Sequence, residues 1–285
     1  MAKILRGKEV AAAMTARMRE DVEKLGAAGI TPTMCIFRVG ERPDDLSYER
    51  GATKRAQSVG VRVVNVVLPA DVSKEDFYHE LDRVNKDDSI HGILLFRPLP
   101  KHLNNKKARH RLNPSKDIDG CTDISLAGVF TNSGLGFPPC TAQAALEILH
   151  HYEIPISGKK VAVIGRSLVI GRPVAMMLMH ENATVTNCHT GTPNVPAITK
   201  KADILIAASG RLHSVTREYT NPDQVIIDVG INWDEQKGKF SGDVDFEDVE
   251  PCVQAITPVP GGVGSVTTCV LISHVIEAAK AALEP

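Results

Sequence analysis

The sequence has little of several features that mark other classes of protein. Aromatic residues make up only 4% of its 285 residues, and its 6 cysteines are scattered, with no Cys-x-x-Cys pair. This spacing excludes a zinc finger, and in a chain of this length it is typical of reduced thiols in a cytoplasmic protein. No signal peptide is apparent, and no stretch approaches the roughly 18 apolar residues of a membrane span. We therefore expect no metal and no membrane partner.

The chain also lacks an excess of charge of either sign. Lys and Arg number 33 and Asp and Glu number 34, which gives a net charge of -1. Because no positive field is available to hold a polyanionic backbone, nucleic acid is not an expected partner. The apolar fraction of 43% is instead typical of a folded globular chain, and 285 residues are about twice the usual domain length. The composition predicts two domains or one large one.

Helical and strand patterns alternate along the first half of the chain. Ser47 is expected to cap one helix and Gly60 to end it. Segment 101–140, rich in Asn, Asp, Gly, Pro and charge, fits neither pattern and is the best candidate for a site-bearing loop region. The alternation predicts a mostly parallel sheet with helices on both faces. The expected helices cover residues 8–26, 48–59, 73–85 and 141–152, and the expected strands cover 33–39, 61–68 and 91–96.

The alternation restarts after Gly158, and a closing helix is expected from Thr268. The sequence therefore predicts an α/β protein with two domains, divided near residues 145–155. The final helix is expected to return to the first domain. The expected strands of the second half cover residues 160–164, 184–188, 203–208 and 225–229, with a helix through Met179 after the first of them.

A glycine-containing turn after the strand at 160–164 is the strongest general signal of function. Backbone amides of such a turn, with the N-terminus of the following helix, cradle a pyrophosphate in dinucleotide-binding proteins. The spacing departs from G-x-G-x-x-G, because Ser167 stands at the second glycine and Gly171 comes one residue late. An ordinary turn between a strand and a helix remains an alternative. A second strand and turn about 20 residues later favour the dinucleotide interpretation.

The second turn bears on the choice of cofactor. Sites specific for NAD usually place Asp or Glu there to hold the ribose hydroxyls. Here the turn is Cys188-His189-Thr190-Gly191-Thr192, with no acidic residue. Arg166 in the first turn is suited to pair with a 2′-phosphate. The sequence thus favours NADP, and NAD remains open.

Three further stretches carry a resemblance to a known family. They are Lys116–Gly120 (Lys-Asp-Ile-Asp-Gly), Pro139–Thr141 (Pro-Cys-Thr) and Thr257–Gly264 (Thr-Pro-Val-Pro-Gly-Gly-Val-Gly). With Gly165-Arg166-Ser167 and the spacing between the motifs, the sequence resembles the methylenetetrahydrofolate dehydrogenase/methenyltetrahydrofolate cyclohydrolase family nearly end to end. The stretch Pro-Gly-Gly-Val-Gly is the most specific of these motifs.

The resemblance implies a fold, an activity and partners. It implies an N-terminal α/β folate-binding domain over residues 1–148 and a C-terminal Rossmann-type parallel sheet over 149–269, with a cleft between them. The helix 270–285 would pack back on the first domain, and the protein would be a homodimer. The implied reaction is the oxidation of 5,10-methylenetetrahydrofolate by hydride transfer to NADP in one-carbon metabolism, for which no metal is required.

The resemblance also assigns residues. An Asp suits a pterin because its two oxygens match the paired N–H donors of the aminopyrimidinone edge, and Asp119 matches the family's pterin-binding Asp. Tyr48 matches the tyrosine that lies over the folate. Taken alone, the two residues are also typical of a loop turn and a half-buried helix aromatic. Catalytic candidates are Tyr48, Asp119 and Lys54. Substrate-binding candidates are Tyr48, Phe96, Arg97, Pro98, Leu99, Asp119, Gly261 and Gly262. Cofactor-binding candidates are Thr141, Gly165, Arg166, Ser167, Ile170, Gly171, His189, Thr190, Ser209, Gly210, Ile231, Gly264 and Thr268.

Two departures from the family pattern fall on its cyclohydrolase step, in which a Lys–Gln pair assists water attack on the amidinium carbon. Ala52 stands at the lysine position and Phe96 at the glutamine position. Lys54 is rotated about 120° from the face of Tyr48 unless the helix is irregular. We therefore expect cyclohydrolase activity to be weak, absent, or run by other groups such as Arg50, Lys54 or Arg97.

Other interpretations stay open at this point. A shikimate-type dehydrogenase also pairs an α/β domain with an NADP-binding domain, but no matching catalytic Lys–Asp pair is found. A nucleotide or folate sensor without catalysis gains weight from Ala52 and Phe96. The histidines have no metal-ligand spacing such as H-E-x-x-H and are interpreted as structural or solvated; they include His91, His150, His151 and His189.

Overall fold

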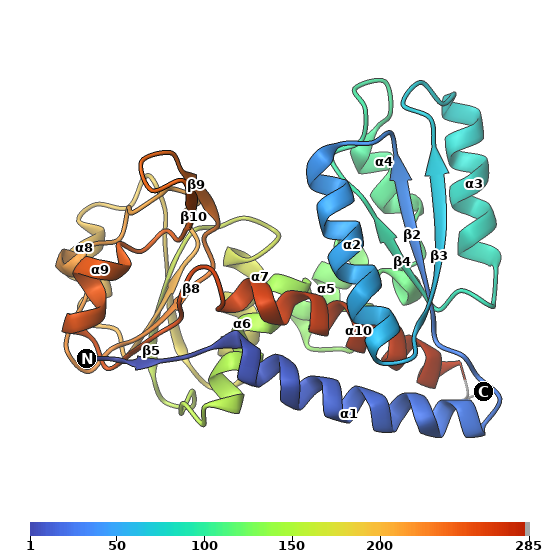
Figure 1. Ribbon diagram of the computed structural model, residues 1–285. Coiled ribbons are helices and arrows are strands. Elements are labelled where there is room, and N and C mark those ends of the chain that lie inside the picture. Colours follow the sequence, from blue (N-terminus) through green and yellow to red (C-terminus); the bar gives the residue numbers. More distant parts are fainter. Residues whose placement is uncertain (283–285) are drawn as a thin grey trace. The chain divides into compact units, whose positions relative to one another are not determined.

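The computed structural model describes residues 1–282 and divides into two compact units (Figure 1). The first unit comprises Met1–Ala12 and Thr141–Thr267, and the second comprises Ala13–Cys140 and the chain from Thr268. Each unit contains its own parallel sheet, which confirms the predicted two-domain α/β fold. The divisions fall within helices α1 (Gly7–Ala27) and α10 (Val263–Ala281) and after the first residue of α6 (Cys140–His151).

A six-stranded parallel sheet forms the framework of the first unit, in the order β1-β11-β8-β7-β5-β6. Every residue of β7 and β8 is buried, as expected for apolar strands covered on both faces. The strands are β1 (Lys3–Ile4), β5 (Lys160–Ile164), β6 (Thr184–Cys188), β7 (Ile204–Ala207), β8 (Val225–Asp228) and β11 (Ala255–Ile256), with a separate antiparallel hairpin of β9 (Asn232–Asp234) and β10 (Lys239–Ser241). The helices are α7 (Gly171–His180), α8 (Val195–Thr199) and α9 (Phe246–Val249), with 3₁₀ turns at Arg217–Tyr219 and Glu250–Cys252.

The order of strands creates a point where the connections change direction. After β1, the chain returns to this sheet at β5, proceeds to β6 on one side, and then crosses to β7 on the other side of β5. In open parallel sheets, ligands bind in the crevice at the carboxyl ends of the strands beside such a switch point. The sequence located β5 through β8 to within one residue at each end but missed the two-residue strands β1 and β11.

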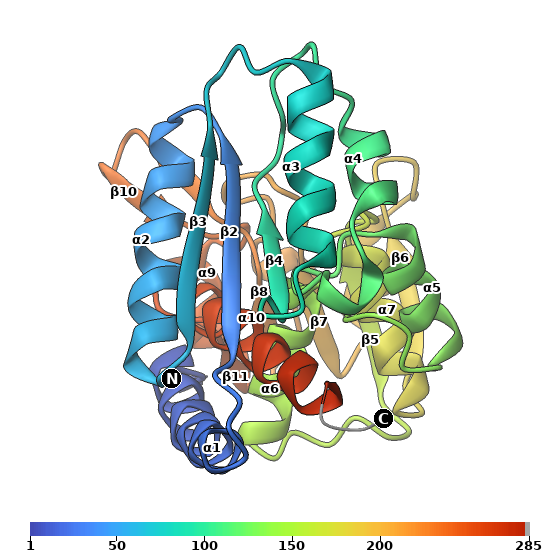
Figure 2. The same ribbon diagram turned by 90° about the vertical axis from the view of Figure 1, so that its right-hand side faces the viewer.

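A three-stranded parallel sheet, β3-β2-β4, forms the framework of the second unit (Figure 2). Its central strand is buried along its whole length. Side chains of α3 pack with one face of the sheet in a core that includes Phe37, Phe77, Leu81 and Ile93. The strands are β2 (Thr33–Val39), β3 (Arg62–Leu68) and β4 (Gly92–Leu95), and the helices are α2 (Pro43–Ser58), α3 (Lys74–Lys86), α4 (Asn105–Arg111) and α5 (Asp123–Thr131), with a 3₁₀ turn at Pro114–Lys116.

Helix α2 begins earlier than the sequence predicted. Its N-cap is Arg42, with no side-chain cap, so the prediction that Ser47 caps this helix is wrong. Pro43 accounts for the early start, because its fixed backbone angle suits the first helical position. Arg38 on β2 donates from Nε to Oε2 of Glu49 at 2.7 Å, which ties the helix to the sheet. The helix is continuous from Pro43 to Ser58, so Gly51 causes no irregularity in it.

Segment 101–140, which fitted no pattern, contains α4, the 3₁₀ turn and α5. The polar residues that obscured these short helices are their caps. Asn104 accepts a hydrogen bond from the Lys107 amide, and Thr122 accepts one from the Ser125 amide. Asn132 ends α5 in the left-handed conformation, with φ of 53°. The composition of the segment thus reflects closely spaced helix ends.

Helix α10 corrects two expectations. It begins at Val263 instead of Thr268, and its length and composition would allow it to cross a membrane, whereas the sequence analysis found no such stretch. Its apolar side chains are nevertheless taken up inside the protein, which is the pattern of a core helix. Those with at most 1% exposure are Val266, Cys269, Val270, Leu271, Ile272, Val275, Ile276 and Ala279.

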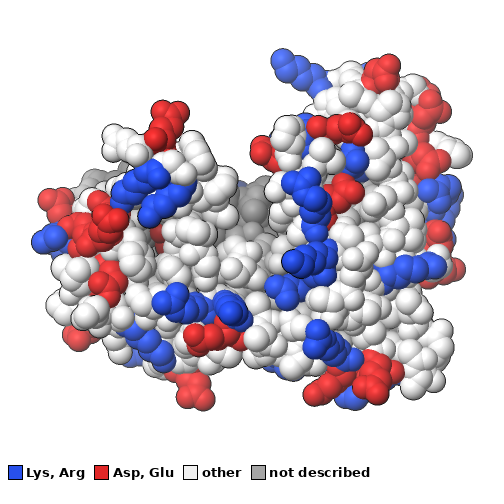
Figure 3. Space-filling model, viewed as in Figure 1, with Lys and Arg blue, Asp and Glu red and all other residues white. Residues whose placement is uncertain are grey.

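Charged side chains of both signs are interspersed over the face shown in Figure 3. Ion pairs in the second unit include Lys280 with Asp21 at 2.7 Å and Arg83 with Glu80 at 2.9 Å, in each of which the basic side chain is exposed and the acidic one half-buried. Such surface pairs contribute little to stability because water and salt screen the charges.

Candidate functional site

The turn between β5 and α7 leaves no room for side chains at its glycines. Gly165 has φ of +126°, and a Cβ there would lie 2.2 Å from the Ala208 carbonyl oxygen. A Cβ on Gly171 would lie 2.3 Å from the Gly165 oxygen. The Ile170 amide donates to Ser167 Oγ at 3.2 Å, which joins the turn to the start of α7. The backbone thus folds as tightly here as a pyrophosphate cradle requires, despite the unusual glycine spacing.

A cavity of about 340 Å³ adjoins this turn at the carboxyl ends of β5 and β7. Arg211, which the sequence analysis did not identify, also lines it. No Asp or Glu lines this cavity in the described part of the chain. Two guanidinium groups without a competing carboxylate suit a ligand that carries phosphate. The predicted cofactor-binding residues that line the cavity are Gly165, Arg166, Ser167, His189, Thr190 and Ser209.

Two buried aspartates, Asp228 and Asp243, fix the backbone that follows β7 and β8 by accepting hydrogen bonds from it. Asp243 Oδ2 accepts hydrogen bonds from Ser209 Oγ at 2.9 Å and from the Gly210 amide at 2.8 Å. Asp228 accepts from the backbone amides of Gly230, Asp243 and Val244 at 3.0 to 3.1 Å. Burial raises the pKa of Asp228 to about 7. Gly210, a predicted cofactor-binding residue, is therefore held by Asp243 and does not line the cavity.

The remaining predicted cofactor-binding residues lie elsewhere. Ile231 is exposed, and a Cβ on Gly264 would lie 3.5 Å from its Cδ1 atom, so these two residues are neighbours. Thr141 is half-buried at the start of α6 in the first unit. Thr268 is half-buried on α10 and belongs to the second unit. None of them lines the 340 Å³ cavity.

The Pro-Gly-Gly-Val-Gly stretch is packed closely against the start of α1. The Gly7 amide donates to the Gly261 oxygen at 2.8 Å, and a Cβ on Gly7 would lie 2.1 Å from the Gly262 oxygen. Gly261 has φ of +102°, and a Cβ on Gly262 would lie 2.5 Å from the Pro258 oxygen. These contacts argue against a flexible loop. Gly7 was missed by the sequence analysis, since nothing local marks its contact with residues more than 250 positions away.

In the second unit, the Asp-Ile-Asp-Gly stretch is held by its first aspartate. Asp117 is fully buried and accepts hydrogen bonds from the Cys121 amide at 3.0 Å, the Thr122 amide at 2.7 Å and Ser125 Oγ at 2.6 Å. These bonds fix the chain between Asp117 and the start of α5. The stretch is thus an anchored loop and not a solvated turn.

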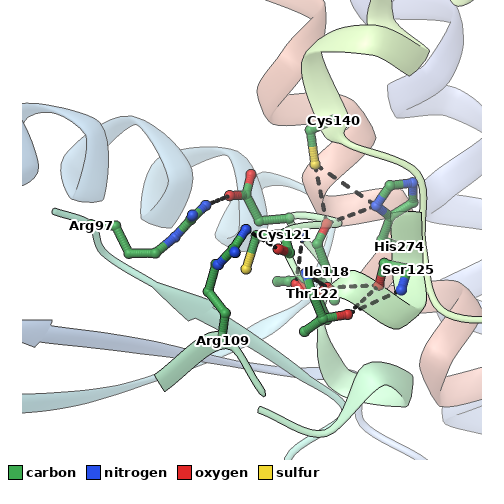
Figure 4. A network of polar contacts seen from close by, with 10 residues as sticks. Arg97, Arg109, Ile118, Cys121, Thr122, Ser125, Cys140 and His274 are labelled. Atoms are coloured by element: carbon green, nitrogen blue, oxygen red, sulfur yellow. Dashed lines mark hydrogen bonds and ion pairs between the residues drawn. The ribbon is translucent and has the colours of Figure 1, made fainter. Parts of the chain in front are cut away.

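The carbonyl of Ile118 anchors the other side of this loop (Figure 4). It accepts hydrogen bonds from His274 Nδ1 at 2.7 Å and from Cys140 Sγ at 3.1 Å. Burial lowers the pKa of His274 to about 4, so the ring is neutral and its Nδ1 proton donates to the carbonyl. Phe137 stacks on this ring, with 4.8 Å between the ring centroids. Residues from α6 and α10 thus set the position of a loop far away in the sequence.

Asp119 is presented at the surface of this loop. Its side chain retains 31% exposure, and Oδ2 lies 3.2 Å from Nη2 of Arg97. Burial raises the pKa of Asp119 to about 6, and the positive charge of Arg97 opposes this rise. The carboxylate is therefore ionised at neutral pH and is able to accept hydrogen bonds from a ligand.

Aromatic and apolar groups lie beside this carboxylate. Tyr48 on α2 meets Phe96 edge to face, with 5.9 Å between centroids and an interplanar angle of 83°. Burial raises the pKa of Tyr48, and the charge of Asp119 raises it further, so the phenol stays neutral. Ala52 is fully buried and Phe96 nearly so. The two positions that the resemblance assigns to a lysine and a glutamine therefore carry no polar side-chain group here.

The other predicted residues of this unit differ in exposure. Leu99 is buried and its amide donates to Asn105 Oδ1 at 2.9 Å, whereas Pro98 is exposed and its oxygen accepts from Arg42 Nη1 at 3.2 Å. Arg50 and Lys54 are exposed. Because α2 is a continuous helix, Lys54 points about 120° away from Tyr48. This position does not support Lys54 as a catalytic partner of Tyr48.

These features define a class: a two-unit α/β protein with a dinucleotide-type cradle in one unit and a positioned carboxylate beside an aromatic ring in the other. Family models agree with this assignment. Residues 5–119 match the catalytic domain of tetrahydrofolate dehydrogenase/cyclohydrolase, and residues 139–283 match its NAD(P)-binding domain. The chain belongs to the tetrahydrofolate dehydrogenase/cyclohydrolase family.

Individual relatives cover the chain from end to end. Over 281 residues it is 50% identical to the bifunctional protein FolD of Carboxydothermus hydrogenoformans, covering 98% of each chain. It is 47% identical to that of Clostridioides difficile, covering 98% of this chain and 96% of the relative. The FolD crystal structure from Campylobacter jejuni matches with a TM-score of 0.95 at 33% identity over 99% of each chain. The Trypanosoma brucei enzyme, complexed with NADP cofactor and an inhibitor, matches with a TM-score of 0.92 at 33% identity, over 100% of this chain and 99% of that one.

Proposed function

We propose that this protein oxidises 5,10-methylenetetrahydrofolate to 5,10-methenyltetrahydrofolate with NADP, and that its cyclohydrolase activity is weak or absent. The observation that carries the first part is the anchored Asp119 loop beside Tyr48. An ionised carboxylate accepts from the paired N–H groups of the pterin edge, and the tyrosine ring packs against the flat pteridine. NADP supplies a hydride acceptor, and the folate nitrogens supply the electron push, so a strong general base is not required.

Within the first unit, the turn of Gly165 and Ser167 is the proposed pyrophosphate site. Its tight backbone and the N-terminus of α7 suit this role. Arg166 and Arg211, with the Thr190 hydroxyl, are the proposed partners of a 2′-phosphate, because they line a cavity without a carboxylate to hold ribose hydroxyls. This argument favours NADP over NAD.

The cofactor proposal is tested by comparing kcat/KM for NADP and NAD in wild type, Arg166→Ala and Arg211→Ala. We expect each substitution to lower kcat/KM for NADP by about tenfold and to leave that for NAD nearly unchanged, since one charge-assisted hydrogen bond is lost. Arg172→Ala, an exposed position on α7 that does not line the cavity, is the matched control. An unchanged preference in both variants would contradict the assignment.

The second part of the proposal rests on Ala52 and Phe96. Water attack on the amidinium carbon requires a group that accepts a proton, and buried apolar side chains at these positions supply none. The contact between Phe96 and Tyr48 fills space from the strand side. Ala52 and Phe96 together fit a site that retains hydride transfer and lacks a group to assist hydrolysis.

Two assays with the purified protein test these claims. Reduction of NADP in the presence of methylenetetrahydrofolate tests the dehydrogenase, and its absence would favour a nucleotide or folate sensor. Hydrolysis of methenyltetrahydrofolate above the uncatalysed rate tests the cyclohydrolase, and turnover comparable to the dehydrogenase would refute the loss. The double variant Ala52→Lys/Phe96→Gln should gain at least about a hundredfold in hydrolysis. Each single variant is the control, because the proposed assistance needs both groups.

We also propose a homodimer in the cytoplasm. The hairpin of β9 and β10 exposes Trp233 and Phe240, which meet edge to face with 5.3 Å between centroids. Adjacent exposed aromatic side chains are typical of interaction surfaces, and a second copy is the proposed partner. Sedimentation of wild type and of Trp233→Ser/Phe240→Ser tests this: a dimer that becomes monomeric supports it, and a monomeric wild type contradicts it.

A further inference from the structure

Arg97 is the charged side chain paired with the proposed pterin-binding carboxylate. It follows Phe96 at the end of β4, and its Nη2 lies 3.2 Å from Asp119 Oδ2. Its Nε atom is buried and has no hydrogen-bond partner within residues 1–282. A buried donor without a partner costs free energy, so such a group in a native structure calls for an explanation.

The neighbouring Arg109 does not share the contact that Arg97 makes with Asp119. Arg109 contacts the same loop, but its Nη1 donates to the Cys121 oxygen at 3.2 Å, and its Nη2 faces Asp123 at 3.5 Å. In Figure 4 the side chains of Arg97 and Arg109 come from separate segments. Of the two, Arg97 is the one that contacts Asp119, through Nη2 at 3.2 Å. The buried Nε is out of reach of a ligand, but the side chain as a whole is 25% exposed and contacts Asp119 through Nη2, so the guanidinium plane is held beside the carboxylate where a ligand can approach it.

The pair presents acceptors and donors side by side. A guanidinium carries five N–H donors in a rigid plane, and a carboxylate carries acceptors only. The pyrimidinone edge of a pterin presents, in order, the 2-amino group and N3–H as donors and the 4-oxo oxygen as an acceptor. Asp119 is complementary to the two donors, and a guanidinium directly beside it is complementary to the oxygen.

We propose that Arg97 determines specificity in the folate site by donating a hydrogen bond to the 4-oxo oxygen of the pteridine while Asp119 binds the adjacent N–H groups. This inference rests on the proposed function. It adds the requirement that position 4 of the ring carry an acceptor. A ring with a 4-amino group would place a donor against the guanidinium, which leaves both groups unpaired and disfavours binding.

The test uses two folate analogues, folic acid with a 4-oxo group and N3–H, and aminopterin with a 4-amino group and an unprotonated N3. Because Asp119 also distinguishes the two at N3, the contribution of Arg97 is the change in their affinity ratio between variants. The dissociation constants are measured by calorimetry for wild type, Arg97→Met, which keeps an unbranched stem and removes every donor, and Arg97→Lys, which keeps the charge. We expect wild type to favour the 4-oxo compound. Arg97→Met should weaken that compound about ten- to hundredfold and the 4-amino compound little, so that the ratio falls by about the same factor. The affinity ratio of Arg97→Lys should lie between the ratios of wild type and Arg97→Met.

Arg109→Met is the matched control, since it removes a guanidinium on α4 that contacts the same loop at the Cys121 oxygen and does not contact Asp119. Repeating the measurements at about pH 8.5 tests whether Arg97 acts only by opposing the rise in the pKa of Asp119. The effect of such a role shrinks as the pH rises, whereas the loss of a direct contact with the ring persists.

The outcomes separate this inference from the proposed function. If Arg97→Met weakens both analogues equally, or leaves their ratio unchanged, the inference is wrong even where wild type reduces NADP. If wild type fails to reduce NADP with methylenetetrahydrofolate, the proposed function fails, and the binding ratio still reports on Arg97.

Discussion

In the first unit the proposed nucleotide site is formed by backbone at one turn, whereas in the second unit the proposed folate site is formed by side chains from distant segments. The turn depends on Gly165 and Gly171, whose close contacts exclude any Cβ. The Asp119 loop depends on a buried carboxylate at Asp117 and on a carbonyl held by His274 and Cys140. Substitutions at the turn should therefore have large effects confined to the first site. In the second site, substitutions far away in the sequence should also change binding.

The largest effect is expected at Asp119. Replacing it by Asn in Asp119→Asn puts an amide donor where the pterin edge also donates, and removes the charge. Loss of two charge-assisted hydrogen bonds predicts a fall in kcat/KM for methylenetetrahydrofolate of about a thousandfold. Steady-state kinetics at saturating NADP measure it. Asp123→Asn, exposed at the start of α5, is the control, and retention of kcat/KM within tenfold in Asp119→Asn would show that the carboxylate is not the pterin ligand.

The next largest effect tests the turn of the first unit. Gly165→Ala places a Cβ 2.2 Å from the Ala208 oxygen at a φ of +126°, so the turn must open. We expect affinity for NADP to fall about a hundredfold, while binding of folic acid in the second unit stays unchanged. Gly158→Ala is a close control, because Gly158 also has a positive φ, +76°, but open space around its Cβ position. Equal losses of NADP affinity in the two variants would refute the close-contact argument.

The same contrast explains what the sequence could predict. The turn after β5 lies within one strand–turn–helix unit, so its position and glycine content could be predicted from local spacing. Asp119 was found only through a family resemblance, since Asp-Ile-Asp-Gly alone is typical of a solvated loop. Its anchors, His274 and Cys140, could not be predicted because the contacts span 156 and 22 residues. Ser47 failed as a cap because Pro43 starts α2 earlier, a competition that periodicity does not reveal.

A smaller effect is expected from pH. Because burial raises the pKa of Asp119 to about 6, the carboxylate is protonated as pH falls through that value and loses an acceptor for the pterin edge. Affinity for folic acid should therefore fall by up to tenfold per pH unit below about 6 and be constant above it. Calorimetric titration measures this dependence. Asp119→Asn should show no midpoint near pH 6, and a wild-type midpoint that persists in this variant would assign the titration to another group.

The smallest effect tests the distant anchor of the Asp119 loop. His274→Phe keeps the stacking against Phe137 and removes the donor to the Ile118 carbonyl. Loss of one buried hydrogen bond predicts a decrease in the free energy of unfolding of about 1–3 kcal/mol, measured by urea denaturation. Because the carbonyl retains Cys140, the loop should shift only slightly, and KM for the folate should rise several-fold with kcat nearly unchanged. A matching fall in kcat would mean that His274 affects more than the position of Asp119. Unchanged stability and KM would mean that Asp117 and Cys140 fix the loop without His274, and the second site would then depend less on distant residues than we propose.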